Sequence, residues 1–331
     1  MKKIALMFVI LTFAASCFFF QGCAKSKDDS QASGKLKIAG IVFQEDQFFR
    51  LFQFGMKDAA KKAGVELLTA NCDNKPDKEI QLVNTYIARQ VDAIIISPLS
   101  ATASVTAIER AHKAGIKVIT YNTTVQGDIP STYIESNQFD LGAQTGKVAR
   151  KYIEEKLNGQ AKVAILAYKS LLAEQSDARS GGFKQQIADM PGVKIVAEQD
   201  AWLPEMAIKK AGDILTANPD IDMIWAANEG GTVGAVLAVK NAGRTGKTVV
   251  FGTDTSEQLT DFLLSDDGIL QAITGQRPFE MGQMTVESAV KILSDKEVEK
   301  IVSMPGLLLT RDDPNAVKAF QTGLEELISR N

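Results

Sequence analysis

The sequence predicts an α/β protein with two doubly wound lobes, each built on a parallel β-sheet. From about residue 36 onward, short apolar runs alternate with amphipathic helical stretches, which is the order of strand–helix–strand units. Most of these runs are unbroken clusters of Val, Ile, Leu and Ala, the pattern of strands buried on both faces. In addition, the same order of strand, helix and strand recurs in the two halves of the chain.

Eight runs are predicted as strands because they are short, apolar and bounded by polar or turn residues. In chain order they are 36–43, 65–71, 91–98, 116–122, 161–168, 193–200, 221–228 and 247–254. Helices are predicted between them, among them 48–64, 77–90, 101–115 and 139–157. Gly64 and Gly115 close two of these stretches, as glycine commonly does at a helix C-terminus.

Polar residues end the matched strands of the two halves. Ser97 and Asn122 occupy these positions in the first half, and Asn228 and Asp254 in the second. Ligands of open α/β sheets bind outside the carboxyl ends of the strands, so two facing lobes would bring all four residues to one cleft. Turns also favour such residues at strand ends. The matched order of both pairs is therefore the stronger indication of a site.

The turn after the first predicted strand combines charge with aromatic rings. Glu45 and Asp46 directly precede the helix that begins near Phe48 and Phe49. Carboxylates and exposed rings together suit a ligand with hydrogen-bonding groups and apolar faces, such as a sugar. One of two adjacent rings at a helix start is usually core, so we expect at least one of them to face the ligand.

The first 35 residues predict an export signal and a tether. A basic "MKK" precedes an apolar run, which ends before "QGC" and a polar stretch, the order of a cleaved signal peptide. The pattern resembles a bacterial lipoprotein signal, which implies a signal peptide at 1–22, lipid on Cys23 and a tether at 23–35. Cys17 is the alternative, but "FFF" follows it. A simple N-terminal anchor would give nearly the same location.

Composition limits the function classes. The chain has 331 residues, 45% of them hydrophobic, and a net charge of −3, which supports a sizeable core and gives no electrostatic case for nucleic acid. Two of its three cysteines lie in the first 23 residues, so Cys72 has no partner for a disulfide in the folded part. No His, Cys and Asp cluster has metal-ligand spacing, and no cofactor or metal is expected.

Several motifs together resemble the type I periplasmic binding proteins of the ribose- and galactose-binding group. They are "FFRLFQFGMKDAAKKAGVEL", "SPLSATASVTAIERAHKAGIKVITYN", "ESNQFDLGAQTGKVARKYI", "DARSGGF", "AANEGGTVGAVLAVKNAG", "FGTD" and "QAITGQRPFEMG". Each alone is weak, but their order and spacing are specific over residues 36–310. The resemblance implies two parallel-sheet lobes, a three-segment hinge and a ligand cleft between them.

The resemblance also implies the ligand-binding residues by position. They are Asp46, Phe48, Phe49, Ser97, Asn122, Arg179, Trp202, Asn228, Asp254 and Gln276. Charged groups among them would hydrogen-bond the hydroxyls strongly, the planar fork of Arg179 would serve two neighbouring hydroxyls, and rings would cover the sugar faces. Ribose-type members often carry Asn where Ser97 stands, and Asp-Arg where this chain has Asn122 and Thr123. These departures leave the identity of the sugar open.

The lobes and hinge are expected at defined positions. The N-terminal lobe is predicted to comprise 36–136 plus 278–303, and the C-terminal lobe 137–277 plus 304–331. Each sheet would take a strand after the chain crosses over, and the crossings are expected near Glu135–Asn137, Arg277–Pro278 and Ser303–Pro305.

The function implied is that of a substrate-binding lipoprotein of an ABC importer. It would bind a monosaccharide or related polyol by hinge closure, act as a monomer on permease subunits, and lie in the periplasm or at the cell surface on a lipid anchor. A chemosensory or quorum-signal sugar receptor would use the same chemistry and stays an alternative. A repressor of the same fold would need an N-terminal helix-turn-helix in place of an export signal.

An enzyme is not expected. His112, the only histidine, lies in a predicted helix and has no nucleophile as a plausible partner. Cys72 is expected to be an inert thiol, since nothing in the spacing suggests a Cys–His pair. The "GGTVG" at 230–234 lacks the Lys and hydroxyl of a phosphate loop, so we expect it to serve close helix packing near the cleft.

Overall fold

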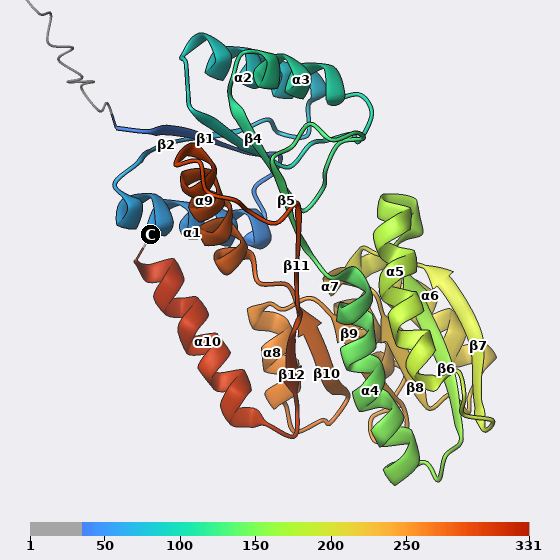
Figure 1. The fold of residues 1–331 in the computed structure, drawn as a ribbon. Helices are drawn as coiled ribbons and strands as arrows, with labels where there is room; N and C mark the ends of the chain where they lie inside the picture. The colour runs from blue at the N-terminus through green and yellow to red at the C-terminus, as the bar shows by residue number, and fades with distance from the viewer. Residues whose placement is uncertain (1–34, 331) are drawn as a thin grey trace, which may run out of the picture. The chain divides into compact units, whose positions relative to one another are not determined.

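The structure is a computed structural model that describes residues 35–330. This part of the chain forms two separate six-stranded sheets, which confirms the predicted fold class (Figure 1). The first sheet has the strand order β11-β5-β4-β3-β1-β2 and is parallel throughout. Its strands are β1 (Lys37–Val42), β2 (Glu66–Asn71), β3 (Ala93–Ile96), β4 (Lys117–Tyr121), β5 (Thr132–Ser136) and β11 (Ile301–Met304).

The second sheet repeats this arrangement with one exception. Its order is β12-β10-β9-β8-β6-β7, and β12 pairs with β10 in the antiparallel direction. Its strands are β6 (Ala161–Ala167), β7 (Val193–Asp200), β8 (Met223–Ala226), β9 (Val249–Thr253), β10 (Leu270–Gly275) and β12 (Leu307–Thr310). All eight predicted runs are strands, whereas β5, β10, β11 and β12 were not among the predicted strands.

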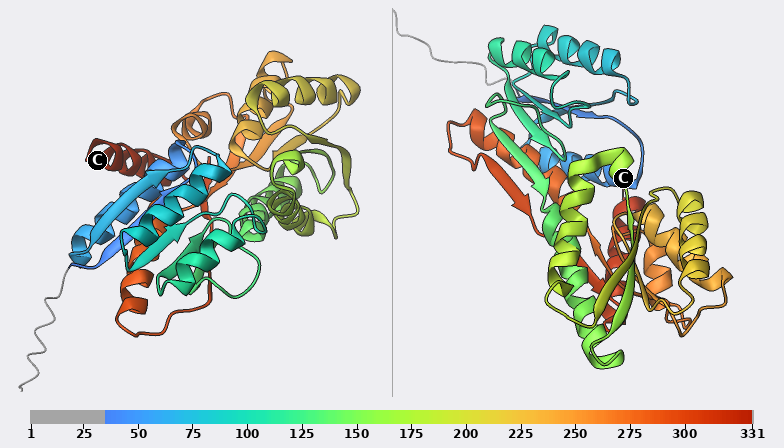
Figure 2. Two further views of the ribbon diagram at one scale, coloured as in Figure 1. Left: turned by 90° about the horizontal axis from the view of Figure 1, so that it is seen from above. Right: turned by 90° about the vertical axis from the view of Figure 1, so that its right-hand side faces the viewer.

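Helices cover both faces of each sheet (Figures 1 and 2). In the first lobe, α1 and α9 share one apolar core with the sheet, and α2 and α3 share another on the opposite face. In the second lobe, α4 and α5 cover one face, and α6, α7 and α8 cover the other. The helices are α1 (Gln47–Ala63), α2 (Pro76–Ala88), α3 (Val105–Lys113), α4 (Gln138–Lys156), α5 (Lys169–Ile187), α6 (Pro204–Ala217), α7 (Glu229–Asn241), α8 (Glu257–Leu264), α9 (Pro278–Leu293) and α10 (Pro314–Ser329).

Close helix packing in each lobe depends on glycine. A Cβ on Gly55 of α1 would lie 1.9 Å from the carbonyl oxygen of Phe279 on α9. A Cβ on Gly142 of α4 would lie 1.8 Å from the carbonyl oxygen of Arg179 on α5. Only glycine permits these approaches. The second approach sets how closely α5 packs against α4 at the position of Arg179.

The chain passes between the two sheets three times. The passages lie between β5 and α4, between β10 and α9, and between β11 and β12. Two hydrogen bonds join them: the Ser136 hydroxyl donates to Oε1 of Gln276 at 2.9 Å, and the backbone N–H of Asn137 donates to the carbonyl of Met304 at 2.8 Å. These bonds hold the three crossing segments side by side where the chain passes from one lobe to the other.

Helix α10 contacts both lobes. Gln321 donates to Thr260 and Asp261 at the second-lobe helix α8, while Leu324 packs with Leu51 and Phe54 on the first-lobe helix α1. The predicted C-terminal lobe included this segment without anticipating its contact with the first lobe.

The predicted signal peptide, tether and lipidation site lie outside the described residues, and so do Cys17 and Cys23. No helix within residues 35–330 is long and apolar enough to span a bilayer.

Candidate functional site

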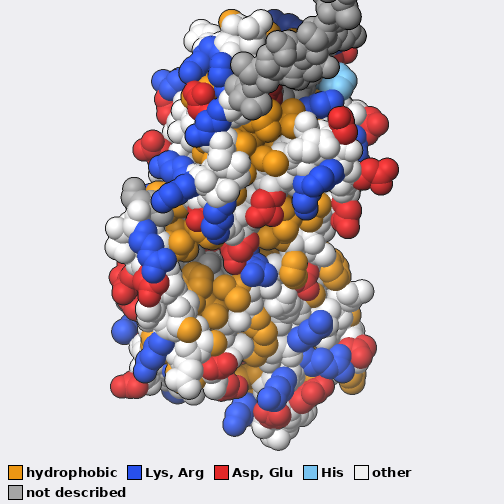
Figure 3. Space-filling model, turned by 60° about the vertical axis from the view of Figure 1, so that its left-hand side comes forward, with side chains coloured by type: hydrophobic (Ala, Val, Ile, Leu, Met, Phe, Trp, Pro, Cys, Tyr) orange, Lys and Arg blue, Asp and Glu red, His pale blue; other side chains and the backbone are white. Residues whose placement is uncertain are grey.

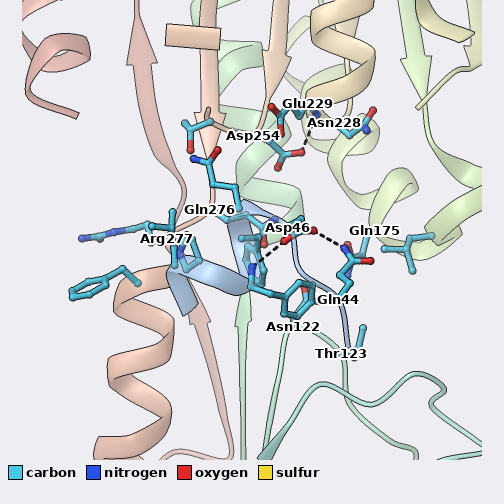
Figure 4. A pocket seen from close by; sticks show the side chains of 18 of the residues that line it. Gln44, Asp46, Asn122, Thr123, Gln175, Asn228, Glu229, Asp254, Gln276 and Arg277 are labelled. Carbon is cyan, nitrogen blue, oxygen red and sulfur yellow. Dashed lines mark hydrogen bonds between the residues drawn. The ribbon is translucent and has the colours of Figure 1, made fainter. Parts of the chain in front are cut away.

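A cavity of about 760 Å³ opens between the carboxyl ends of the two sheets, within the size range of small-molecule sites. Segments from both lobes and from the crossings line it (Figure 4). Eight of the ten predicted site residues are among the lining residues: Asp46, Phe48, Phe49, Asn122, Arg179, Asn228, Asp254 and Gln276. Ser97 and Trp202 are not.

The turn before α1 brings a carboxylate and a ring to the cavity. Asp46 caps α1, because its Oδ1 accepts a hydrogen bond from the backbone N–H of Phe49 at 2.9 Å, as N-cap residues do. Its other oxygen accepts a hydrogen bond from Gln44 (Figure 4). Phe49 is 3% exposed and packs edge-on against Phe43 at 4.4 Å between ring centroids, whereas Phe48 is only half-buried. Phe49 thus anchors the turn, and Phe48 is the more accessible ring.

Asn122 and Thr123 present the end of β4 to the cavity. Asn122 has a φ of 57°, in the left-handed region that asparagine tolerates better than most residues, and its carbonyl accepts a hydrogen bond from the Tyr133 hydroxyl. Ser97 is 1% exposed, and its hydroxyl lies 2.8 Å from Oγ1 of Thr123. Thr123 also donates to the carbonyl of Pro98 at 2.7 Å. Ser97 therefore contacts Thr123, and of the two only Thr123 is among the lining residues.

A buried ion pair forms the second-lobe wall. Arg179 is 3% exposed, and its Nη1 donates to Oδ1 and Oδ2 of Asp254 at 3.1 and 3.2 Å and to the carbonyl of Ala227 at 2.9 Å. Its Nε donates to Oε1 of Gln138 at 2.8 Å. Nη2 has no hydrogen-bond partner among the described residues. Arg179 also lines the cavity, so this nitrogen retains hydrogen-bonding capacity at the edge of the site.

The surroundings of Arg179 keep its guanidinium protonated and positively charged. Burial by itself lowers the pKa of the guanidinium, but Asp254 and Tyr168 more than offset it, and the pKa lies above its usual value. The Tyr168 ring lies 5.3 Å from the guanidinium carbon, a distance at which a cation is attracted to the ring face. Burial also raises the pKa of Tyr168 to about 12, so this side chain stays a neutral phenol.

Asp254 and Asn228 form one network at the start of α7. Asp254 has a φ of 70°, and its Oδ2 accepts a hydrogen bond from the backbone N–H of Glu229 at 3.0 Å (Figure 4). Asn228 caps α7 through Gly231 and donates from Nδ2 to the carbonyl of Trp202 at 2.8 Å. These bonds fix both side chains before any ligand arrives.

Trp202 is not among the residues that line the cavity. Its side chain packs, partly buried, against the core between α4, α5 and the second sheet. The stacking role implied for Trp202 therefore has no support from this geometry.

Sequence reasoning missed several lining residues, among them Tyr168, Gln175 and Glu229. Tyr168 directly follows β6, and Glu229 directly follows Asn228. The strand-end argument that indicated Ser97 and Asn228 would have found both. Burial raises the pKa of the Glu229 carboxyl, and the neighbouring Asp254 and Asp46 raise it further, against a hydrogen bond from Ser256. The cavity lining thus includes four carboxyl side chains, those of Asp46, Glu229, Asp254 and Glu280, and two guanidiniums, those of Arg179 and Arg277.

The residues expected to be inert lie apart from the cavity lining. His112 is exposed on α3. Cys72 is 1% exposed, and burial raises the pKa of its thiol to about 11. Among residues 35–330 no group of three His, Cys, Asp or Glu side chains has a metal-binding arrangement. On the face drawn in Figure 3, positive and negative side chains are interspersed and not gathered by sign.

Comparison with known proteins fits a two-lobed solute-binding architecture. A family model described as a periplasmic binding protein domain matches residues 41–297. The chain belongs to this family. It is 29% identical to the ABC transporter periplasmic-binding protein YphF of Escherichia coli, over 85% of this chain and 88% of that protein. It is 30% identical to the D-apiose import binding protein of Actinobacillus succinogenes, over 88% and 89% respectively.

Solved structures of solute-binding proteins share the fold. An ABC transporter periplasmic solute-binding protein from Actinobacillus succinogenes with bound D-allose superposes with a TM-score of 0.76 and 28% identity, covering 85% of this chain and 100% of that one. One from Bacillus halodurans with bound myo-inositol gives a TM-score of 0.75 and 25% identity, covering 87% and 98%.

Proposed function

We propose that this periplasmic binding protein is the solute-binding component of an ABC importer and takes a monosaccharide or related polyol into the cavity between its lobes. The observation that carries the proposal is the second-lobe wall, where a buried Arg179–Asp254 pair offers an unused guanidinium nitrogen to the cavity. Relatives named for D-apiose import and structures with D-allose or myo-inositol support this ligand class.

The lining suits a neutral polyhydroxylated molecule. Arg179 Nη2 would donate to hydroxyl oxygens, and Asp46 and Asp254 would accept from hydroxyl hydrogens; such charge-assisted bonds are the strong ones. Gln276 accepts from Ser136 through Oε1 and has no partner among the described residues for its amide nitrogen. Phe48 would cover an apolar sugar face. The lining has four carboxyl groups against two guanidiniums, and one of these, Arg277, pairs with Glu280 at 3.0 Å; this excess of carboxyl groups disfavours anionic ligands.

Binding without chemistry is the simplest use of this site. The relatives reported above are named as binding proteins, and Arg179, Asp254 and Asn228 are engaged in fixed hydrogen bonds rather than in a nucleophile–base pair. The proposal includes no cofactor, no metal and no catalytic residue. Nothing in the comparisons favours a chemosensory or quorum-signal receptor over an importer.

Closure of the lobes would complete the site. Residues 36–136 plus 278–303 and residues 137–277 plus 304–331 would move as two bodies about the three crossings. No described hydrogen bond or ion pair joins the first-lobe turn at Asp46 to the Arg179 wall. A ligand that contacts both would stabilise the closed state, since ligands favour whichever state they contact more.

The expected place of action is outside the cytoplasm, as the family name indicates. We further propose a lipid anchor on Cys23, with Cys17 as the alternative, and a monomer that delivers its solute to permease subunits. Metabolic lipid labelling tests the anchor: Cys23→Ala should lose the label and Cys17→Ala should keep it. Loss of the label in the Cys17 variant alone would reverse the assignment.

A thermal-shift screen against sugars, polyols and nucleosides tests the solute class, because a ligand of the folded state raises apparent stability. We expect at least one sugar or polyol to raise the melting temperature, and Arg179→Ala to reduce that rise. His112→Ala, on the exposed face of α3, is the matched control and should behave as wild type. Stabilisation only by nucleosides, or by no compound, would contradict the proposal.

A further inference from the structure

Two leucines stand exposed at the mouth of the cavity. Leu171 is 50% exposed and Leu172 is 40% exposed, and both line the cavity. They follow Tyr168, the residue that packs against Arg179 at the end of β6. Single exposed leucines need no explanation on a surface. Two adjacent exposed leucines on the wall of a binding cavity do need an explanation, because a ligand in the cavity would contact that wall.

The backbone holds these leucines in a turn of their own. At Leu172 the φ and ψ of −142° and 84° break α5, so the turn 169–172 is set apart from the rest of the helix. The N–H groups of Leu171 and Leu172 both donate to the carbonyl of Tyr168, at 3.0 and 3.1 Å. The N–H of Ser170 donates to Asp200 at 3.2 Å, and Lys169 pairs with Asp177 at 2.7 Å. The backbone of this turn is thus bonded at several points.

Further apolar lining comes from both lobes, and in the second lobe it includes Leu307, Phe320 and Leu324. Phe43 and Phe48 are half-buried and line the same cavity, and they belong to the segment that leads into α1. Rings can stack on the face of any pyranose or furanose. Leucine side chains have no ring face and no polar atom, so they contribute only apolar contact and cannot satisfy a hydroxyl.

We propose that Leu171 and Leu172 select a sugar that carries a methyl group in place of a hydroxymethyl group, the class of 6-deoxyhexoses. This inference rests on the proposed function and names the substrate class of the same site. A methyl group against the leucines leaves water with a gain in free energy. A hydroxyl in the same position loses its hydrogen bonds to water without replacement.

The expected preference is limited in size. Discrimination by one methylene, or against one added hydroxyl, in an apolar pocket is about 10- to 200-fold. We therefore expect the 6-deoxy sugar of the preferred stereochemistry to bind roughly 10- to 100-fold more tightly than its hydroxymethyl counterpart. The Leu171→Ser/Leu172→Ser double variant should reduce this preference to within a few-fold, chiefly by weakening the deoxy sugar.

Matched sugar pairs test the inference by isothermal titration calorimetry on the purified full chain in a detergent without sugar groups. The pairs are L-fucose with L-galactose, D-fucose with D-galactose, L-rhamnose with L-mannose, and 6-deoxy-D-glucose with D-glucose. Ile195→Ser is the matched control, because Ile195 is 44% exposed on β7 and does not line the cavity. Circular dichroism checks that each variant is folded.

The outcomes separate this inference from the proposed function. A deoxy preference in wild type and in Ile195→Ser that is lost in the double leucine variant supports the inference. Equal or tighter binding of the hydroxymethyl sugars, or a preference that survives in the double variant, overturns it and leaves sugar binding intact. Unchanged sugar affinities with impaired uptake would also overturn it, since the leucines would then serve contact with the permease. If no sugar binds, the proposed function is wrong and this inference falls with it.

Discussion

Replacing Asp254 with Ala should destabilise the second lobe, because it leaves the buried Arg179 guanidinium without its carboxylate partner. Arg179 is almost fully buried, while the Asp254 side chain is 23% exposed. In the Asp254→Ala variant the guanidinium would keep only the neutral acceptors at Ala227 and Gln138. The backbone N–H of Glu229 would lose its carboxylate partner as well.

The size of the effect follows from these contacts. Breaking a buried ion pair by removing one partner costs about 3–5 kcal/mol. Solvent reaches a quarter of Asp254, and Arg179 keeps two hydrogen bonds, so a smaller loss of about 2–3 kcal/mol in the free energy of unfolding is expected. Substituting Arg179→Met in the same chain removes the unpaired charge while keeping an apolar side chain of similar length. The double variant should therefore be more stable than Asp254→Ala alone.

Urea unfolding followed by circular dichroism measures both variants, with the denaturant slopes compared to confirm that the same surface unfolds. Asp254→Asn serves as a control that retains one hydrogen-bond acceptor and should lose less than Asp254→Ala. Two results would refute the reasoning: an Asp254→Ala protein within about 0.5 kcal/mol of wild type, which is the range of ordinary surface substitutions, or a double variant less stable than the single one.

Further predictions concern binding, pH, thiol reactivity and helix packing. Arg179→Ala and Asp254→Ala, provided they are folded, should each weaken ligand binding by at least about 1.5–3 kcal/mol, the range for hydrogen bonds to charged groups; wild-type affinity by calorimetry would show that these residues do not hold the ligand. Because the folded-state pKa of Glu229 lies above its ordinary value of 4.5, its ionised form costs stability above that folded pKa; Glu229→Gln should be more stable than wild type at pH 7, and the difference in unfolding free energy should vanish below pH 4.5. Cys72 should react slowly with a thiol reagent at pH 8 in the native protein and quickly in urea, with the labelled site located by mass spectrometry, since its pKa of about 11 leaves little thiolate; rapid native labelling would contradict its burial. Gly142→Ala should cost about 1–3 kcal/mol or more by forcing α4 away from α5 and should also weaken ligand binding by displacing Arg179; an unchanged urea midpoint and affinity would show that the helices can separate without effect.

Much of the fold was predictable from continuous apolar runs. A parallel strand covered by helices on both sides must be apolar on both faces, and β3 with the sequence "AIII" or β9 with "VVFGT" shows this directly. The strands that were missed have weaker patterns. In β5, buried and half-buried residues alternate, and three of the four residues of β11 are exposed or half-buried. Strand β5 lies between β4 and β11 in the sheet. Strand β11 pairs only with β5, 168 residues earlier in the sequence (301 − 133), and no local pattern records so distant a partner.

The candidate site divides in the same way. The sequence by itself determined which residue types stand at the strand ends and before α1, because parallel strands bring their carboxyl ends to one edge of a sheet. Only the tertiary structure decided which of those side chains reach the cavity. The hydroxyl of Ser97 is turned to Thr123, and the partly buried ring of Trp202 packs against the core of its own lobe. Arg179 pairs with Asp254 from a helix, α5, that packs closely on α4 at Gly142. Side-chain direction depends on neighbours that are distant in sequence, and those neighbours are fixed only when the helices and sheets have packed.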